Sequence, residues 1–250
     1  MKKTIFFLLI VFTTSTHAQF TESIFSKNPV IHLENWQKQK LYFGFFLGLN
    51  SYDFKFNYKA NVTDDIQVLK TTGFNVGLVA DLRLQEYINL RFEPGLYFTK
   101  RTLDYPENYF INYGLIRKAK DTIREINSTY IHFPLLLKFS ALRTGNIRPY
   151  LVGGLSITLN LSSNAKAPLD NFDTDEKGFR LKAWSPNYEL GFGIDIFSEY
   201  FIFSPSVRGV FGLKDELIQD NPRLDGVESP WTSNIESMRT RGLFINFTFH

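Results

Sequence analysis

The residues best suited to acid–base or metal chemistry are few and scattered. Histidine most often moves protons in active sites, and the chain has four: His17, His32, His132 and His250. They are too far apart in the sequence for a local metal site. The absence of Cys excludes a thiol nucleophile, a Cys-ligated metal site and a disulfide scaffold. One catalytic grouping can be assembled, His132 with Ser128 and Asp121, so a lipid-modifying enzyme stays a minor alternative. We expect no catalytic, cofactor or metal site.

Charged residues form a second pattern, around two short turns. If the flanking segments are antiparallel hairpins, residues that face each other must point to the same side of the sheet. Counting from the turns places Asp81 opposite Arg91 and Glu189 opposite Arg208. Five further residues share that inner face: Arg83, Glu93, His132, Lys138 and Asp195. We predict a network of buried ion pairs; a selective pore or a catalytic carboxylate cluster is the alternative.

The elements that must position these residues are strands. Between residues 72 and 84 the even positions are apolar and the odd positions are mostly polar or glycine, and 88–101 has the same alternation. A period of two is typical of strands with one apolar and one polar face. Each segment has roughly ten to fourteen residues, enough to cross a bilayer when tilted. Eight are predicted: 41–50, 72–84, 88–101, 128–139, 148–161, 185–196, 201–211 and 239–249.

The connections alternate between short and long. Three are short turns: 85–87, 140–147 and 197–200. Four are long: 51–71, 102–127, 162–184 and 212–238. An even number of strands with this alternation predicts an all-β fold, an eight-stranded antiparallel transmembrane β-barrel of the outer membrane with short periplasmic turns and long extracellular loops. A soluble lipocalin-type barrel is the alternative. Charge and glycine in mid-strand and aromatics near strand ends favour the membrane barrel.

The N-terminus predicts export. Lys2 and Lys3 precede an apolar run, and small and polar residues lead to a cleavage site between Ala18 and Gln19. We therefore divide the chain into a signal peptide (1–18), a periplasmic lead-in (19–40) and a barrel (41–250). Without the two lysines, 26 basic residues stand against 25 acidic ones, which gives no case for nucleic-acid binding.

Prolines conflict with this strand assignment. Proline lacks the N–H that a sheet ladder needs, so we expect prolines at bulges or strand starts. Five fall inside or at the start of predicted strands: Pro94, Pro134, Pro149, Pro186 and Pro205.

Several segments together carry a family resemblance. They are Arg91 to Leu96 (RFEPGL), Tyr130 to Phe139 (YIHFPLLLKF), Arg148 to Gly154 (RPYLVGG) and Tyr200 to Gly212. They resemble the small outer-membrane barrels that include the PorT family, and Tyr200 to Gly212 looks the most particular to PorT. The resemblance implies a part in type IX secretion, which also serves gliding motility in some bacteria, and implies no catalytic residues.

Barrel size limits the function further. The interior of eight strands is just wide enough for side chains, so a folded protein cannot pass. We expect a non-enzymatic secretion accessory, a scaffold or assembly partner, that contacts outer-membrane lipid and other secretion proteins. A generic small porin or adhesin is the alternative. Loop 212–238 is as consistent with a docking site as with a solvated loop.

Overall fold

The computed structural model describes residues 31–35, 38–59, 65–106, 122–163, 165, 180–219, 231–232 and 234–250. The main strands are β1 (Leu41–Tyr58), β3 (Thr72–Arg83), β4 (Ile88–Phe92), β5 (Gly95–Asp104), β6 (Ile123–Ser140), β7 (Ile147–Asn160), β9 (Trp184–Phe197), β10 (Ile202–Gly212) and β12 (Ile235–Phe249). Three shorter strands are β2 (Gln67–Lys70), β8 (Arg180–Leu181) and β11 (Leu217–Ile218). Within these residues, no helix is long and apolar enough to cross a membrane.

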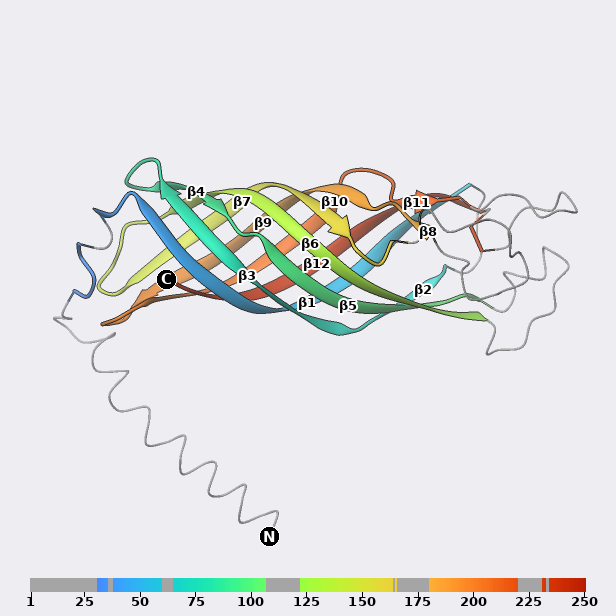
Figure 1. Ribbon diagram of the computed structural model, residues 1–250, viewed down its shortest axis with the longest axis horizontal. Helices are drawn as coiled ribbons and strands as arrows, with labels where there is room; N and C mark the ends of the chain where they lie inside the picture. The colour runs from blue at the N-terminus through green and yellow to red at the C-terminus, as the bar shows by residue number, and fades with distance from the viewer. Residues whose placement is uncertain are drawn as a thin grey trace, which may run out of the picture.

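The main strands close into a ring. β4 and β5 are two parts of one strand position, and the ring runs β1, β12, β10, β9, β7, β6, β4 with β5, and β3. β1 pairs with β12 on one side and with β3 on the other, which closes the sheet. Every pairing is antiparallel, so the eight-stranded barrel predicted from the sequence is confirmed. The short turns lie at one end of the barrel, with the C-terminus, and β2, β8 and β11 lie at the other (Figure 1).

The two faces of the strands differ as a membrane barrel requires. On β1, Phe43, Phe45 and Leu47 point outward and are half-exposed or more, whereas Phe46 and Asn50 point inward and are buried. The other main strands also expose Leu, Ile, Val and Phe side chains on their outer faces. These form an apolar belt around the barrel, and lipid accepts such a belt where water would not.

The strands are longer than predicted at the loop end. β1 continues eight residues beyond 50, and β6 begins at Ile123 rather than 128. The reason is that apolar side chains change faces along the strand. Beyond Ser51 the inward residues are Phe54 and Phe56, while the outward ones are polar. This end lies above the membrane, so its exterior faces water and its interior can be apolar. We name this end the extracellular head.

The prolines are not at bulges, but two of them are near strand starts: Pro149 and Pro186 are the third residues of β7 and β9. The ladder of β6 runs through Pro134 and that of β7 through Pro149 without a change of register. At Pro94 the strand is interrupted between β4 and β5, yet the pairing with β3 keeps the same count on both sides. Each proline therefore costs a ladder hydrogen bond without adding a residue to its strand. The one register shift between β1 and β12 lies at Asn57 and Tyr58.

The structure confirms the predicted register in one of the two hairpins that carry the charge pairs and contradicts it in the other. Asp81 lies opposite Arg91, as expected. In the second hairpin Arg208 lies opposite Gly191 and Glu189 opposite Val210, so the predicted register is wrong by two residues. A shift of two keeps each side chain on its face.

The register error comes from the turn between β9 and β10. We expected the turn to begin at Phe197. Instead Phe197 is buried, ends β9 and pairs with Ile202. The Arg143 guanidinium lies 3.8 Å from the centre of its ring. Phe197 therefore belongs to β9, and the turn comprises residues 198–201.

Candidate functional site

The barrel interior holds one cluster of charges near its periplasmic end, centred on Asp195 of β9. The Lys138 Nζ lies 2.7 Å from both oxygens of this carboxylate, and the Arg148 Nη2 lies 3.0 Å from Oδ2. The Ser204 hydroxyl also donates a hydrogen bond to Oδ1 at 2.7 Å. All four residues are buried. One carboxylate therefore joins strands β6, β7, β9 and β10.

A second set of charges forms a continuous chain across the lumen. The Arg91 Nη2 lies 2.8 Å from Asp81 Oδ2, and its Nη1 lies 3.2 Å from Glu93 Oε1. Arg208 continues the chain, with Nη1 at 2.7 Å from Glu93 Oε2 and Nε at 3.2 Å from Glu189 Oε2. Because all five are buried, each charge depends on its partners to offset the cost of leaving water.

His132 ends this chain. Its Nε2 lies 2.6 Å from Glu189 Oε1, and its Nδ1 lies 2.8 Å from the Thr158 hydroxyl. The Asn187 amide donates to the same hydroxyl at 2.8 Å. His132 is fully buried. Its polar atoms are thus bonded within the lumen, as a structural role requires.

The grouping proposed for a lipid enzyme is not formed. The Ser128 hydroxyl accepts a hydrogen bond from Arg101 Nη2 at 3.1 Å, whereas His132 bonds to Thr158 and Glu189. Asp121 lies outside the described residues. In the described part of the chain, no three His, Asp or Glu side chains are arranged to hold a metal ion.

The structure also contains network members that the sequence did not indicate. Arg148 was quoted only as part of a family pattern, although it shares its parity with Tyr150 and Val152, which are buried. The alternation in the sequence alone could therefore have placed Arg148 on the inner face. Arg83 was predicted to join the network. It is the last residue of β3, is only partly buried, and its N–H donates to the Lys40 carbonyl at 2.9 Å.

The buried network is balanced in formal charge. Its four carboxylates are Asp81, Glu93, Glu189 and Asp195, and its four cations are Arg91, Lys138, Arg148 and Arg208. Buried aromatic rings fill the space beyond it, among them Phe46, Tyr97 and Phe244. A pocket remains at the periplasmic end, lined by Tyr42, Asn89, Phe197 and His250 together with network residues. Above this pocket, the buried charges of the network and the rings of Phe46, Tyr97 and Phe244 project into the lumen.

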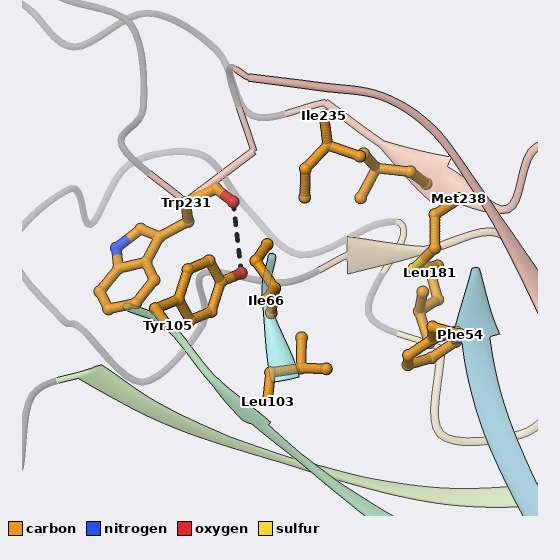
Figure 2. Close-up of a cluster of buried hydrophobic side chains, with 9 residues drawn as sticks. Phe54, Ile66, Leu103, Tyr105, Leu181, Trp231, Ile235 and Met238 are labelled. Atoms are coloured by element: carbon orange, nitrogen blue, oxygen red, sulfur yellow. Dashed lines mark hydrogen bonds between the residues drawn. The ribbon is translucent and has the colours of Figure 1, made fainter. Parts of the chain in front are cut away.

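The extracellular head has its own apolar core (Figure 2). Nine buried residues form it: Phe54, Ile66, Leu103, Tyr105, Leu181, Leu217, Trp231, Ile235 and Met238. The Tyr105 and Trp231 rings pack edge to face with centres 5.0 Å apart, and the Tyr105 hydroxyl donates to the Trp231 carbonyl at 3.3 Å. These residues come from β1, β5, β8, β11, β12 and the loops between them. The core therefore holds several loops together over the mouth of the barrel.

Beneath this core lies a buried cation, Arg101 of β5. Its guanidinium lies 3.9 Å from the centre of the Phe54 ring and hydrogen-bonds to Ser128 and Tyr130. Glu216 is buried nearby and accepts from the Thr240 N–H at 3.2 Å and hydroxyl at 2.7 Å. Burial raises the pKa of Glu216, while the Thr240 hydrogen bonds and the Arg101 charge act in the opposite direction.

At the opposite end, residues 31–35 of the lead-in contact the turn between β6 and β7. The Arg143 Nη2 donates to the His32 carbonyl at 2.6 Å and to Asn146 Oδ1 at 2.8 Å. The His32 N–H donates to the same Asn146 oxygen at 3.1 Å. The predicted cleavage site at Ala18 and Gln19 lies outside the described residues. The described part of the lead-in is thus held at the periplasmic mouth.

Most of the sequence matches a known family model. The match is to the outer membrane protein beta-barrel domain, over residues 18–217. The chain belongs to this family. It follows that the protein is located in the outer membrane. No functionally curated protein matches the chain.

Solved structures with a similar fold are small outer-membrane barrels. The N-terminal β-barrel domain of Pseudomonas aeruginosa OprF is 14% identical, with 84% of this chain and 100% of that chain covered and a TM-score of 0.37. OprG from the same organism is 15% identical, with 84% and 95% covered and a TM-score of 0.41. Ail of Yersinia pestis is 8% identical, with 84% and 98% covered and a TM-score of 0.34. At these identities the likeness concerns the fold alone.

Proposed function

We propose that this protein is a sealed, non-enzymatic outer-membrane barrel that acts as an accessory to protein secretion through surfaces at its two ends. The observation that carries the proposal is the set of buried ion pairs and aromatic rings inside the barrel. The chain from Asp81 to His132 crosses the interior, and aromatic rings pack beyond it. A solute would have to displace buried, paired charges to pass, which is costly.

The two ends supply the working surfaces. The head is a folded unit because its core joins segments from four connections and the ends of three strands, β1, β5 and β12. At the periplasmic end the contacts of Arg143 and Asn146 fix where the lead-in leaves the barrel. A scaffold or assembly partner needs defined surfaces of this kind on both sides of the membrane.

Type IX secretion is the specific system that we propose, on the basis of the PorT resemblance. The test is deletion of the gene, with export of cargo proteins to the medium as the readout. We expect cargo to remain in the periplasm, and gliding to be lost where the bacterium glides. Complementation with the full chain should restore export. Intact export in the deletion strain would refute the secretion role.

Purification from the outer membrane provides a direct test of partners. We expect the tagged full-length protein, extracted in mild detergent, to bring down an outer-membrane pore or a periplasmic secretion component. Arg143→Gln is the comparison variant for the periplasmic end, because it removes the hydrogen bond from Arg143 to the lead-in. Recovery of the barrel alone under several extraction conditions would contradict an accessory role.

An adhesin is the second candidate, and the folded head favours it. A rigid extracellular unit is suited to surface attachment as well as to docking within a secretion machine. The two functions separate in the deletion strain. An adhesin predicts reduced attachment with normal export, whereas the secretion accessory predicts loss of export.

A further inference from the structure

One part of the outer wall carries basic residues directly above the apolar belt. On β12 the outward residues change from Leu243, which is half-exposed, to Arg241 and then Arg239. On β1 they change from Leu49 to Ser51, Asp53 and Lys55. At about 3.4 Å per residue, with the strands tilted, Arg241 stands roughly 5 Å above the last exposed leucine. This is the level of the lipid headgroups.

The residues that the structure describes do not balance the charges on this wall. Lys55 lies directly opposite Arg239 in the ladder, and neither forms an ion pair with any residue the structure describes. Two other cations share one carboxylate oxygen. Arg241 Nη2 and Lys70 Nζ lie 3.0 and 3.1 Å from Asp53 Oδ2.

The net charge of this surface is therefore +3, from four cations and one carboxylate. We call Lys55, Lys70, Arg239 and Arg241 the basic wall. Like charges facing each other across a ladder are destabilising unless a counter-charge is supplied. Two further acidic residues, Glu236 and Asp65, lie beyond it toward the loops, and Asp65 is bonded to the Tyr58 hydroxyl.

Other parts of the circumference differ at this end. On β5 and β6 the outward Lys100 is paired with Glu125 at 2.8 Å. On β9 and β10 the outer face has aromatic residues instead, with Tyr188 stacked on Phe211 at 5.0 Å and Trp184 exposed. Within the described strands, the outward cations without a counter-charge of their own thus lie on β1 and β12.

We propose that the basic wall binds the phosphate-bearing headgroup of an outer-leaflet lipid. The acyl chains would lie against Leu49, Leu243 and the aromatic residues below them, while the long basic side chains reach the phosphates. Such side chains combine an apolar stem with a charged end and suit this boundary. An anionic headgroup supplies the counter-charge that Lys55 and Arg239 lack.

The test uses the folded full-length protein in detergent, with bis-phosphorylated lipid A as the probe. Binding is measured by native mass spectrometry and compared with dephosphorylated lipid A. Each cation near an anionic membrane surface contributes about 1 kcal/mol, so each removed charge should weaken binding about fivefold. We expect K55Q and R239Q each to show this loss, and the double variant the product of both.

Lys100→Gln is the matched control, because Lys100 is also outward at this end but already paired. It should bind as the unchanged protein does. Equal binding by the double variant, or equal binding of dephosphorylated lipid A, would overturn the proposal. Inorganic phosphate should compete weakly, since it has no acyl chains; competition as strong as that of the lipid would also overturn it. If R239Q does not fold, R241Q replaces it. R241Q leaves Asp53 paired with Lys70.

Discussion

The lumen within the membrane and the core of the extracellular head lie on the inner faces of the same strands, yet the lumen combines ion pairs with aromatic rings whereas the head core is apolar. In the membrane the inner face holds ion pairs such as Arg91 with Asp81, and the outer face is apolar. In the head the inner face holds Leu103 and Phe54, and the outer face holds Lys55 and Arg239. Parity is unchanged along β1, while its outward residues change from apolar to polar beyond Leu49.

The surroundings explain this change. In lipid, burial of apolar surface yields no gain, and polar side chains can find partners only inside the barrel. Above the membrane, water surrounds the strands, and burying apolar side chains is the main favourable contribution. The interior is therefore stabilised in two ways: chiefly by charge pairing in the membrane and by hydrophobic packing in the head.

Removal of one buried charge should have the largest effect. Arg208→Met leaves Glu93 and Glu189 without their shared cation, and breaking a buried pair in this way costs about 3–5 kcal/mol. We expect a lower unfolding midpoint in urea for protein in lipid vesicles. Adding Glu93→Gln to Arg208→Met should recover part of the loss, because one uncompensated charge is then gone. A single variant as stable as the unchanged protein would show that the network does not hold the lumen together.

Truncation in the head should act locally. Leu103 is fully buried, so Leu103→Ala should cost the head about 2–5 kcal/mol. We expect faster protease cleavage of the loops in intact vesicles with the unfolding midpoint of the barrel unchanged. Leu69→Ala is the control, since Leu69 is 55% exposed on the neighbouring β2. If Leu103→Ala lowered the barrel midpoint, the head and the lumen would be a single cooperative unit.

A smaller, pH-dependent effect is expected at Glu216, between the two regions. Its raised pKa means that the folded protein binds this proton more tightly than the unfolded chain does. Its contribution to stability is therefore most favourable below the unfolded pKa and is lost as the pH rises through the folded pKa. Glu216→Gln should make the head more resistant to heat at neutral pH, and the difference should vanish in acid. An equal difference at both pH values would contradict this assignment.

The smallest effect is expected on the outer surface of the barrel. Lys100 and Glu125 form an ion pair at 2.8 Å, but their side chains are 44% and 57% exposed. Exposed pairs of this kind contribute about 0–1 kcal/mol. Lys100→Gln should therefore leave the urea midpoint almost unchanged, in contrast to Arg208→Met. A large shift would mean that charge pairs contribute equally inside and outside the barrel.

The comparison also explains how far the sequence could predict the fold. Alternation predicted eight strands because apolar residues stay on the outer face within the membrane. The predicted boundaries at residues 50 and 128 made both strands too short at the loop end, because apolar residues move to the inner face at Phe54 and Ile126. A prediction that requires apolar residues at one parity ends each strand where the outer face leaves the membrane and meets water. The short strands β8 and β11 have two residues each and no period to detect.

The candidate site shows the same limits. Parity placed Asp81, Glu93, Glu189 and Asp195 on one inner face, and these positions are buried. Parity does not determine which cation each carboxylate meets. The partner of Glu93 across the lumen is Arg208, 115 residues away along the chain. That contact depends on closure of the barrel, which no local pattern encodes.

Conductance is the measurement that tests the sealed barrel most directly. The full-length protein is inserted into planar lipid bilayers, and current is recorded over a range of voltages, with Leu103→Ala beside it. We predict no channel steps above the protein-free baseline for either protein, because the charge network closes the lumen even when the head is loosened. Steady single-channel steps from the unchanged protein would contradict the account and make it a small porin.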